Sequence, residues 1–290
     1  MFTGAFVALV TPFQDGEIDF RTLDELIDFQ LENGIDGIVP VGTTGESPTL
    51  SHEEHKQVIE RVVKAVAGKV PVIAGAGSNS TAEAIELAAF SKKVGADATL
   101  QVDPYYNKPA QEGFYQHFKA VAEEVDLPMV LYDIPGRCGA GMTANTVVRL
   151  SEVENIVGIK DATGKMDHVS EIATRCDLTI LSGDDSMTLP IASVGGKGVV
   201  SVVANIVPAD VKAMTDAILE ADFGQALKWH KKLFGLCRNM LTLATNPIPI
   251  KAAVAMLNMA SDEMRLPMTP LDESNKAVLR RTLREYGLLE

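Results

Sequence analysis

Ile156-Val157-Gly158-Ile159-Lys160-Asp161 is a short apolar run that carries a lysine near its end. Runs of this length, bounded by polar residues, are typical of a β-strand covered on both faces, as in a parallel sheet. Lysine is almost never fully buried without a partner or a function. A dry pocket disfavours the ammonium form, so the pKa falls and the amine can form a Schiff base with a carbonyl substrate. The alternative is a strand-end lysine whose amine extends into solvent.

Seven other runs have the same character, and the eight together predict the strands of one sheet. The eight runs are Phe6–Val10, Gly37–Val41, Val70–Ala74, Ala98–Val102, Met129–Asp133, Ile156–Lys160, Leu178–Leu181 and Gly198–Val202. Between them, apolar residues recur at helical spacing, as in Leu23-Leu26-Ile27-Gln30-Leu31. Two segments, Ser51 to Glu54 and Ser80 to Glu83, fit a capping box and predict helix starts.

The spacing of these runs decides between two parallel-sheet architectures. The strands start at intervals of roughly 20 to 35 residues, as eight β/α units would in a barrel of this size. An open doubly wound sheet is the alternative. No Gly-x-Gly-x-x-Gly turn follows the first strand, which disfavours a dinucleotide-binding sheet. We therefore predict an α/β fold, a (β/α)8 TIM barrel.

The C-terminal part of the chain has a different pattern. From about Pro208 to Glu290 only helical patterns occur, at Ala226–Leu243, after Pro249 and at Glu273–Tyr286. We predict a catalytic barrel over residues 1–223 and a small helical appendage over residues 224–290.

Composition excludes several classes of protein. The formal net charge of −13 disfavours nucleic acid as a partner. No stretch is apolar and long enough to span a membrane, and the first residues lack the basic segment of a signal peptide. Three cysteines, Cys138, Cys176 and Cys237, show no metal or redox spacing. We expect a cytoplasmic protein with reduced thiols.

Polar residues follow several predicted strands, where the catalytic groups of a barrel lie. Thr43 and Thr44 could hold a carboxylate through hydroxyl and backbone N–H groups, or form a plain turn. Tyr132 could relay protons to an adduct on Lys160, and Arg137 could bind a carboxylate with its guanidinium fork. Asp184 and Asp185 have no third ligand at usable spacing, so we expect no metal site.

The chain resembles the dihydrodipicolinate synthase family of the pyruvate-dependent class I aldolase (N-acetylneuraminate lyase) superfamily. The resemblance covers essentially the whole chain, and five blocks carry it: Gly42-Thr43-Thr44-Gly45-Glu46-Ser47, Pro104-Tyr105-Tyr106-Asn107-Lys108-Pro109, Tyr132-Asp133-Ile134-Pro135-Gly136-Arg137, Ile159-Lys160-Asp161-Ala162-Thr163-Gly164 and Asn246-Pro247-Ile248-Pro249. It implies a condensation of pyruvate with L-aspartate 4-semialdehyde, the committed step of diaminopimelate and lysine biosynthesis, with no cofactor beyond the imine.

The resemblance also implies the role of each site residue. Lys160 would form the pyruvate imine, and Thr43, Tyr132 and Tyr106 would relay protons, with Tyr106 supplied by a neighbouring subunit. Thr44 would hold the pyruvate carboxylate and Arg137 that of the semialdehyde, while Gly183 and the carbonyl of Val200 would shape the pocket. We expect a homotetramer built as a dimer of dimers.

A regulatory lysine site is implied at a cleft between subunits. The matching residues are Ser47, His52, His55, Asn79, Glu83 and Tyr105. Pro48 departs from the lysine-sensitive pattern, in which a smaller, non-proline residue is common. Feedback inhibition by lysine is the expectation.

Two other functions compete with this hypothesis. One is a sibling lyase that acts on a keto sugar acid such as N-acetylneuraminate through the same Schiff base. Arg137 and the paired tyrosines speak against it. The other is a catalytically silent barrel that only binds pyruvate or lysine. The presence of Lys160 and Tyr132 speaks against that alternative.

Overall fold

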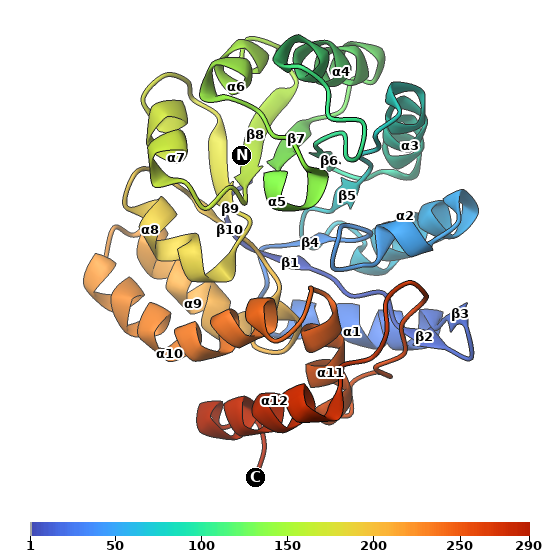
Figure 1. Ribbon diagram of the computed structural model, residues 1–290, viewed down its shortest axis with the longest axis vertical. Coiled ribbons are helices and arrows are strands. Elements are labelled where there is room, and N and C mark those ends of the chain that lie inside the picture. Colours follow the sequence, from blue (N-terminus) through green and yellow to red (C-terminus); the bar gives the residue numbers. More distant parts are fainter. Residues whose placement is uncertain (1) are drawn as a thin grey trace.

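Eight parallel strands form a nearly closed barrel in the computed structural model, which describes residues 2–290 (Figure 1). In chain order they are β1 (Gly4–Ala8), β4 (Gly37–Val39), β5 (Ile73–Gly75), β6 (Ala98–Val102), β7 (Met129–Asp133), β8 (Ile156–Asp161), β9 (Thr179–Ser182) and β10 (Gly198–Ser201). A parallel bridge between Ile38 and Val72 spans the gap between β4 and β5. The predicted (β/α)8 barrel is confirmed.

The helices that follow the strands form an outer ring around the barrel (Figure 1). They are α1 (Phe20–Glu32), α2 (His52–Val66), α3 (Thr81–Val94), α4 (Gln111–Glu124), α6 (Ala144–Leu150), α7 (Met166–Ala173), α8 (Thr188–Ala192) and α9 (Pro208–Leu219). Smaller elements are the hairpin β2 (Phe13–Gln14) and β3 (Glu17–Ile18), the helical turn α5 (Pro135–Cys138), and the 3₁₀ turns η1 (Ser47–Thr49), η2 (Asp185–Met187) and η3 (Val203–Asn205). This ring buries the outer face of every strand, which explains the continuous apolar runs in the sequence.

Six of the eight strands differ from their predicted bounds by one to three residues, and hydrogen bonds explain the differences at the first and third strands. The first strand runs from Gly4 to Ala8 rather than Phe6–Val10. It ends there because the N–H of Val10 donates to the Asn205 side chain at 3.1 Å instead of to a strand. The third strand, predicted at Val70–Ala74, begins only at Ile73. Pro71 has no N–H to donate, and the N–H of Val72 donates to Asp97 at 2.8 Å.

One of the two predicted capping boxes is confirmed and the other is wrong. Ser51 and Glu54 bond each other's backbone N–H at the start of α2, as a capping box requires. Ser80 precedes α3 but its side chain caps nothing. The Ser78 hydroxyl instead donates to Glu83 at 2.7 Å and accepts from the N–H of Ser80 at 3.1 Å. Glu83 is therefore held by a loop residue.

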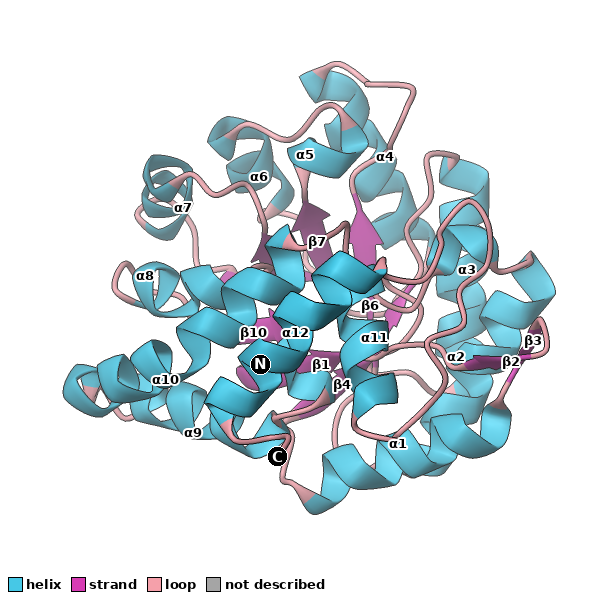
Figure 2. Ribbon diagram, turned by 60° about the horizontal axis from the view of Figure 1, so that its bottom comes forward, coloured by secondary structure: helices cyan, strands magenta, loops and turns pink. Residues whose placement is uncertain are grey.

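Three helices follow the barrel and lie together on one side of it (Figure 2). They are α10 (Phe223–Thr242), α11 (Ile248–Met256) and α12 (Glu273–Tyr286). The helical pattern predicted after Pro208 is confirmed, and apolar residues of these helices share one core cluster with β1, α1 and α9. No helix in the described part of the chain is long and apolar enough to cross a membrane.

Alternation along the strands divides the side chains of β7 and β8 between two environments. Tyr132 pairs with Lys160 across the two strands, and Asp133 pairs with Asp161. Successive strand residues point to opposite faces. Tyr132 packs among apolar side chains of the barrel interior such as Phe6 and Val200. The barrel thus turns one tyrosine and one lysine inward, side by side.

Candidate active site

Lys160 lies in the barrel interior against Tyr132. Its Nζ atom is 3.9 Å from the centroid of the Tyr132 ring, and the residue is only 6% exposed. Gly183, at the end of β9, leaves room for it, because a Cβ there would lie 3.1 Å from Cε of Lys160 and 2.8 Å from Cβ of Ala162. The alternative of a lysine that extends into solvent is wrong.

Burial lowers the pKa of Lys160 to about 7. Removal of water from the ammonium group is the main cause, Arg137 adds to it, and the carboxylate of Asp185 opposes it. A large share of the amine is therefore unprotonated near neutral pH. This is the form that attacks a carbonyl carbon.

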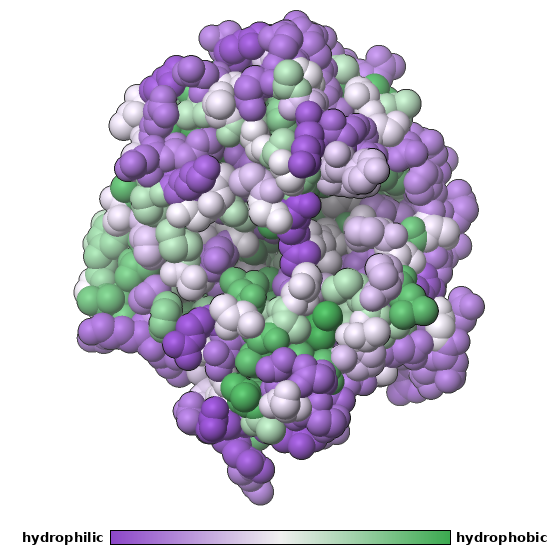
Figure 3. Space-filling view, in the orientation of Figure 1, coloured by the Kyte–Doolittle hydropathy of each residue, from purple (hydrophilic) through white to green (hydrophobic). Residues whose placement is uncertain are grey.

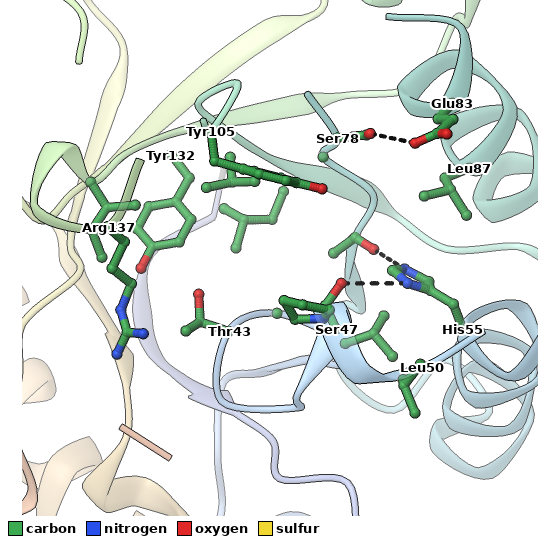
Figure 4. Close-up of a pocket in the computed structure, with 18 of the residues that line it drawn as sticks. Thr43, Ser47, Leu50, His55, Ser78, Glu83, Leu87, Tyr105, Tyr132 and Arg137 are labelled. Atoms are coloured by element: carbon green, nitrogen blue, oxygen red, sulfur yellow. Dashed lines mark hydrogen bonds between the residues drawn. The ribbon is translucent and has the colours of Figure 1, made fainter. Parts of the chain in front are cut away.

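Tyr132 stands between Lys160 and the Gly42–Ser47 loop. Burial raises the pKa of its phenol to about 12, while Arg137 and the Thr43 hydroxyl lower it. The hydroxyls of Tyr132 and Thr43 point toward one another (Figure 4). The phenol keeps its proton at neutral pH and can pass it along this pair.

The Gly42–Ser47 loop follows β4 and carries the two threonines. Backbone bonds fold it tightly: the N–H groups of Gly45 and Ser47 both donate to the carbonyl of Gly42, at 3.1 and 3.3 Å. Thr44 is buried, and its hydroxyl accepts from the side chain of Asn246 at 3.0 Å. The same Asn246 accepts from Arg137 through its carbonyl at 2.8 Å.

A cavity of about 420 Å³ opens beside these residues. The molecular surface is hollowed near the centre of the face in Figure 3. Thr43, Tyr132 and Arg137 line one end of the cavity, together with Cys138. Burial raises the pKa of the Cys138 thiol to about 12, so it stays protonated and unreactive. Lys160, Thr44, Gly183 and Val200 are not among the residues that line the cavity.

Four residues of the implied lysine site, Ser47, His55, Glu83 and Tyr105, lie on the other side of this cavity in Figure 4. Ser47, His52, His55, Glu83 and Tyr105 line it. Asn79 lies beside them, and its side chain donates to the Tyr105 carbonyl at 3.0 Å.

His55 is the buried member of this group. Its Nε2 lies 2.7 Å from the Gly75 carbonyl, which can only accept, so Nε2 carries the hydrogen. Burial lowers the pKa of His55, and the neutral ring offers Nδ1 to the Ser47 hydroxyl at 3.5 Å.

Tyr106 is set apart from the other predicted catalytic residues. It is 90% exposed, and its backbone has a φ of 73°, in the left-handed region that tyrosine rarely adopts. The structure does not bring it to the site within one chain.

Sequence reasoning assigned no role to two groups of residues beside the site. Asp185 is buried, and its carboxylate accepts from the Ser201 hydroxyl and from the N–H of Val202 at 2.8 Å. Glu46 lies in one of the blocks that carry the resemblance, and Lys251 lies two residues after another. Their side chains form a buried ion pair at 2.6 Å. Their partners come from distant parts of the chain, so spacing could not reveal them.

One group of described residues has donors close enough to hold a cation. Atoms of Asp133, Asp161 and His168 lie within 4.8 Å of one another behind β7 and β8. The carboxylate of Asp133, 3.4 Å from the His168 ring nitrogen, raises the pKa of that histidine. A protonated imidazole is the natural counter-charge here, and we assign no metal to it. Asp184 and Asp185 do not belong to this group.

Comparisons with known proteins agree with the geometry. A family model described as the dihydrodipicolinate synthetase family matches residues 1–286. A 4-hydroxy-tetrahydrodipicolinate synthase from Pelobacter propionicus is 50% identical over the full length of both chains. The dihydrodipicolinate synthase from Acinetobacter baumannii, solved with pyruvate, is 43% identical with a TM-score of 0.97 and full coverage of both chains. That from Cyanidioschyzon merolae, solved with lysine bound, is 42% identical with a TM-score of 0.96 and 99% coverage of each.

The lowered pKa of Lys160 predicts how its amine reacts with pH. Acetylation by acetic anhydride, followed by peptide mass spectrometry, should reach half its maximal rate near pH 7, because the amine is protonated below that pH and free above it. A lysine with the ordinary pKa of about 10.4 would reach half its maximal rate only near that pH. Lys160→Met is the control that identifies the labelled peptide. A midpoint near pH 10 would contradict the burial argument.

Proposed function

The chain belongs to the dihydrodipicolinate synthetase family, and on that basis we propose that it condenses pyruvate with L-aspartate 4-semialdehyde to give 4-hydroxy-tetrahydrodipicolinate. The observation that carries the proposal is the buried amine of Lys160 at 3.9 Å from the Tyr132 ring, with its pKa lowered to about 7. A Schiff-base enzyme needs such an amine and a proton carrier beside it.

The reaction starts with attack of the Lys160 amine on the ketone carbon of pyruvate. Loss of water from the adduct leaves an imine, and Tyr132 with Thr43 carries the protons that the departing hydroxyl requires. Removal of a proton from the methyl carbon gives an enamine, which attacks the aldehyde carbon of the second substrate. The amino group of that substrate then attacks the imine carbon, closes the ring and releases Lys160. One water is formed for each pair of substrates.

Charged and polar groups at the cavity place the two carboxylates. The backbone and hydroxyls of Thr43 and Thr44 hold the carboxylate of pyruvate near Lys160. Arg137, exposed at the cavity and fixed through the Asn246 carbonyl, binds the carboxylate of the semialdehyde with its planar fork. Gly183 and the carbonyl of Val200 shape the wall next to the imine.

Two measurements test this function. Borohydride added with pyruvate should inactivate the protein and leave one reduced pyruvyl group on the peptide that contains Lys160. The protein should form product from pyruvate with aspartate semialdehyde but not with N-acetylmannosamine. Lys160→Met should lose both the adduct and the activity while its melting temperature is kept. Preference for N-acetylmannosamine, or an adduct on another lysine, would overturn the proposal.

Free lysine is proposed as an inhibitor that binds at Ser47, His52, His55, Asn79, Glu83 and Tyr105. The support is that most of these residues line the same cavity as Thr43 and Tyr132. Glu83, held by Ser78, offers a carboxylate for an ammonium group. A ligand here could move the Thr43 hydroxyl through the short segment that joins it to Ser47.

Calorimetry tests the lysine site. Lysine should bind saturably, and Glu83→Gln should weaken binding by about ten-fold or more, since a hydrogen bond to a charged group is lost. Glu86→Gln is the matched control: it lies on the same helix and pairs with Lys56 instead of lining the cavity. Equal effects of the two substitutions, or no binding at millimolar lysine, would contradict the proposed site.

The protein is further proposed to work as a homotetramer, a dimer of dimers, in which Tyr106 completes the site of a neighbouring subunit. An exposed aromatic side chain on strained backbone is costly to leave in water and suits an interface.

The three free thiols fit a reducing cytoplasm. We also propose that the chain consists of a catalytic barrel, residues 1–223, and a C-terminal helical domain, residues 224–290.

Hybrid assemblies test the shared site. Tyr106→Phe and Lys160→Ala should each be inactive, and a mixture should regain part of the activity, because some sites then receive both native side chains. Native mass spectrometry should verify the hybrids. No recovery in verified hybrids, or full activity in a protein shown to be monomeric, would count against a site made by two chains.

A further inference from the structure

Glu46 and Lys251 form an ion pair that the proposed reaction does not use. Both side chains are 1% exposed, and Nζ of Lys251 lies 2.6 Å from the Glu46 carboxylate. Lys251 comes from α11, in the C-terminal helices, whereas Glu46 belongs to the Gly42–Ser47 loop of the barrel. Buried ion pairs of this kind add little to the free energy of unfolding, because the loss of hydration of the two charges offsets their attraction. Their role must be sought in what they hold in place.

The Lys251 ammonium and the Glu46 carboxylate each make further contacts with nearby residues. Lys251 also donates to the Thr11 carbonyl at 3.0 Å, and its Nζ lies 4.3 Å from the centroid of the Phe13 ring. The second oxygen of Glu46 accepts from the N–H of Arg265 at 3.3 Å. A Lys251 side chain with these contacts has a single position available, and it fixes that of Glu46.

The ion pair fixes the loop that carries the two threonines. Glu46 has a φ of 54°, a left-handed conformation that costs energy and persists only where the surroundings enforce it. Its N–H donates to the Thr43 carbonyl at 3.1 Å. The preceding carbonyl, that of Gly45, accepts from the Thr11 hydroxyl at 2.7 Å. Thr43 and Thr44 thus lie two and three positions before Glu46, whose backbone and side chain are both held by hydrogen bonds.

The same C-terminal segment reaches the site at a second point. Asn246 lies five positions before Lys251 in the sequence. Its side chain donates to the Thr44 hydroxyl at 3.0 Å, and its carbonyl accepts from Arg137 at 2.8 Å. The segment from Asn246 to Lys251 therefore contacts the loop at Thr44 and at Glu46. It also binds the Arg137 guanidinium at the cavity.

We infer that Lys251 is a positioning residue of the active site: clamped to Glu46, it holds the Thr43 and Thr44 hydroxyls where they meet the pyruvate carboxylate. The inference rests on the proposed function, because it assigns pyruvate to this loop. It gives α11 a role in the active site, although none of its side chains lines the cavity. Pyruvate binding should depend on Lys251, and the choice of aldehyde should not.

A pair of variants separates positioning from stability. Lys251→Met leaves the Glu46 charge buried without a partner, and its melting temperature should fall. Adding Glu46→Gln removes that charge, and the double variant should melt close to the wild type, since neutral replacements of a buried pair are well tolerated. The double variant should still show a KM for pyruvate raised by about ten-fold, with the KM for aspartate semialdehyde changed by less than about two-fold. Lys276→Met, which removes a lysine paired with Asp262 on the outside of the helical segment, is the control.

Borohydride trapping measures pyruvate binding at Lys160 without the second substrate and without turnover. The pyruvate concentration that half-saturates trapping on Lys160 should rise in the double variant by the same factor as the KM. If melting temperature and half-saturation both return to wild-type values, the pair is only structural and the inference is overturned. If wild-type protein traps no pyruvate on Lys160, the proposed function and the inference fail together. A double variant that stays as unstable as Lys251→Met and keeps the wild-type half-saturation in its folded fraction also overturns the inference.

Discussion

Desolvation of one amine is the constraint on which this structure depends. Lys160 lies inside an apolar barrel, where an ammonium ion loses its hydration and the pKa falls to about 7. A strand that placed this lysine one position away would turn it outward, toward the helices, because side chains alternate along a strand. The register of β7 against β8, with Tyr132 beside Lys160, is therefore the central feature of the chemistry. Asp133 and Asp161, one position on, meet His168 on the opposite side.

The charged groups near the Lys160 amine leave a large share of it neutral near pH 7. Asp185, which would stabilise the ammonium form, has its carboxylate occupied by Ser201 and by the N–H of Val202. Arg137 acts in the other direction and lowers the pKa. The barrel thus keeps a largely unprotonated amine beside a protonated phenol near neutral pH, which is the combination that imine formation requires. The C-terminal part of the chain completes this arrangement, since the side chains of Asn246 and Lys251 contact the loop that carries the threonines.

The accuracy of prediction from the sequence followed the range of the interactions involved. Strands bounded by clear breaks, such as Ala98–Val102 and Met129–Asp133, have the predicted bounds. The first strand ends early because Asn205, almost two hundred residues away, takes the N–H of Val10. The capping box at Ser80 is absent because Ser78 takes the Glu83 carboxylate first. In both of these cases a side chain outside the local pattern offers a better partner to a backbone or carboxylate group.

The sequence by itself determined the barrel and its helical C-terminal part, and it identified the candidate residues of a Schiff-base site. Periodicity and the position of polar residues at strand ends are local properties, and a lysine in an apolar run is visible without any neighbour. Only the tertiary structure decided which groups face the amine, that Asp185 and Arg137 act on its pKa in opposite directions, and that Lys251 is buried against Glu46. These facts depend on residues as far apart as Thr44 and Asn246. Burial and electrostatic interaction depend on distance in space, which the order of residues along the chain does not contain.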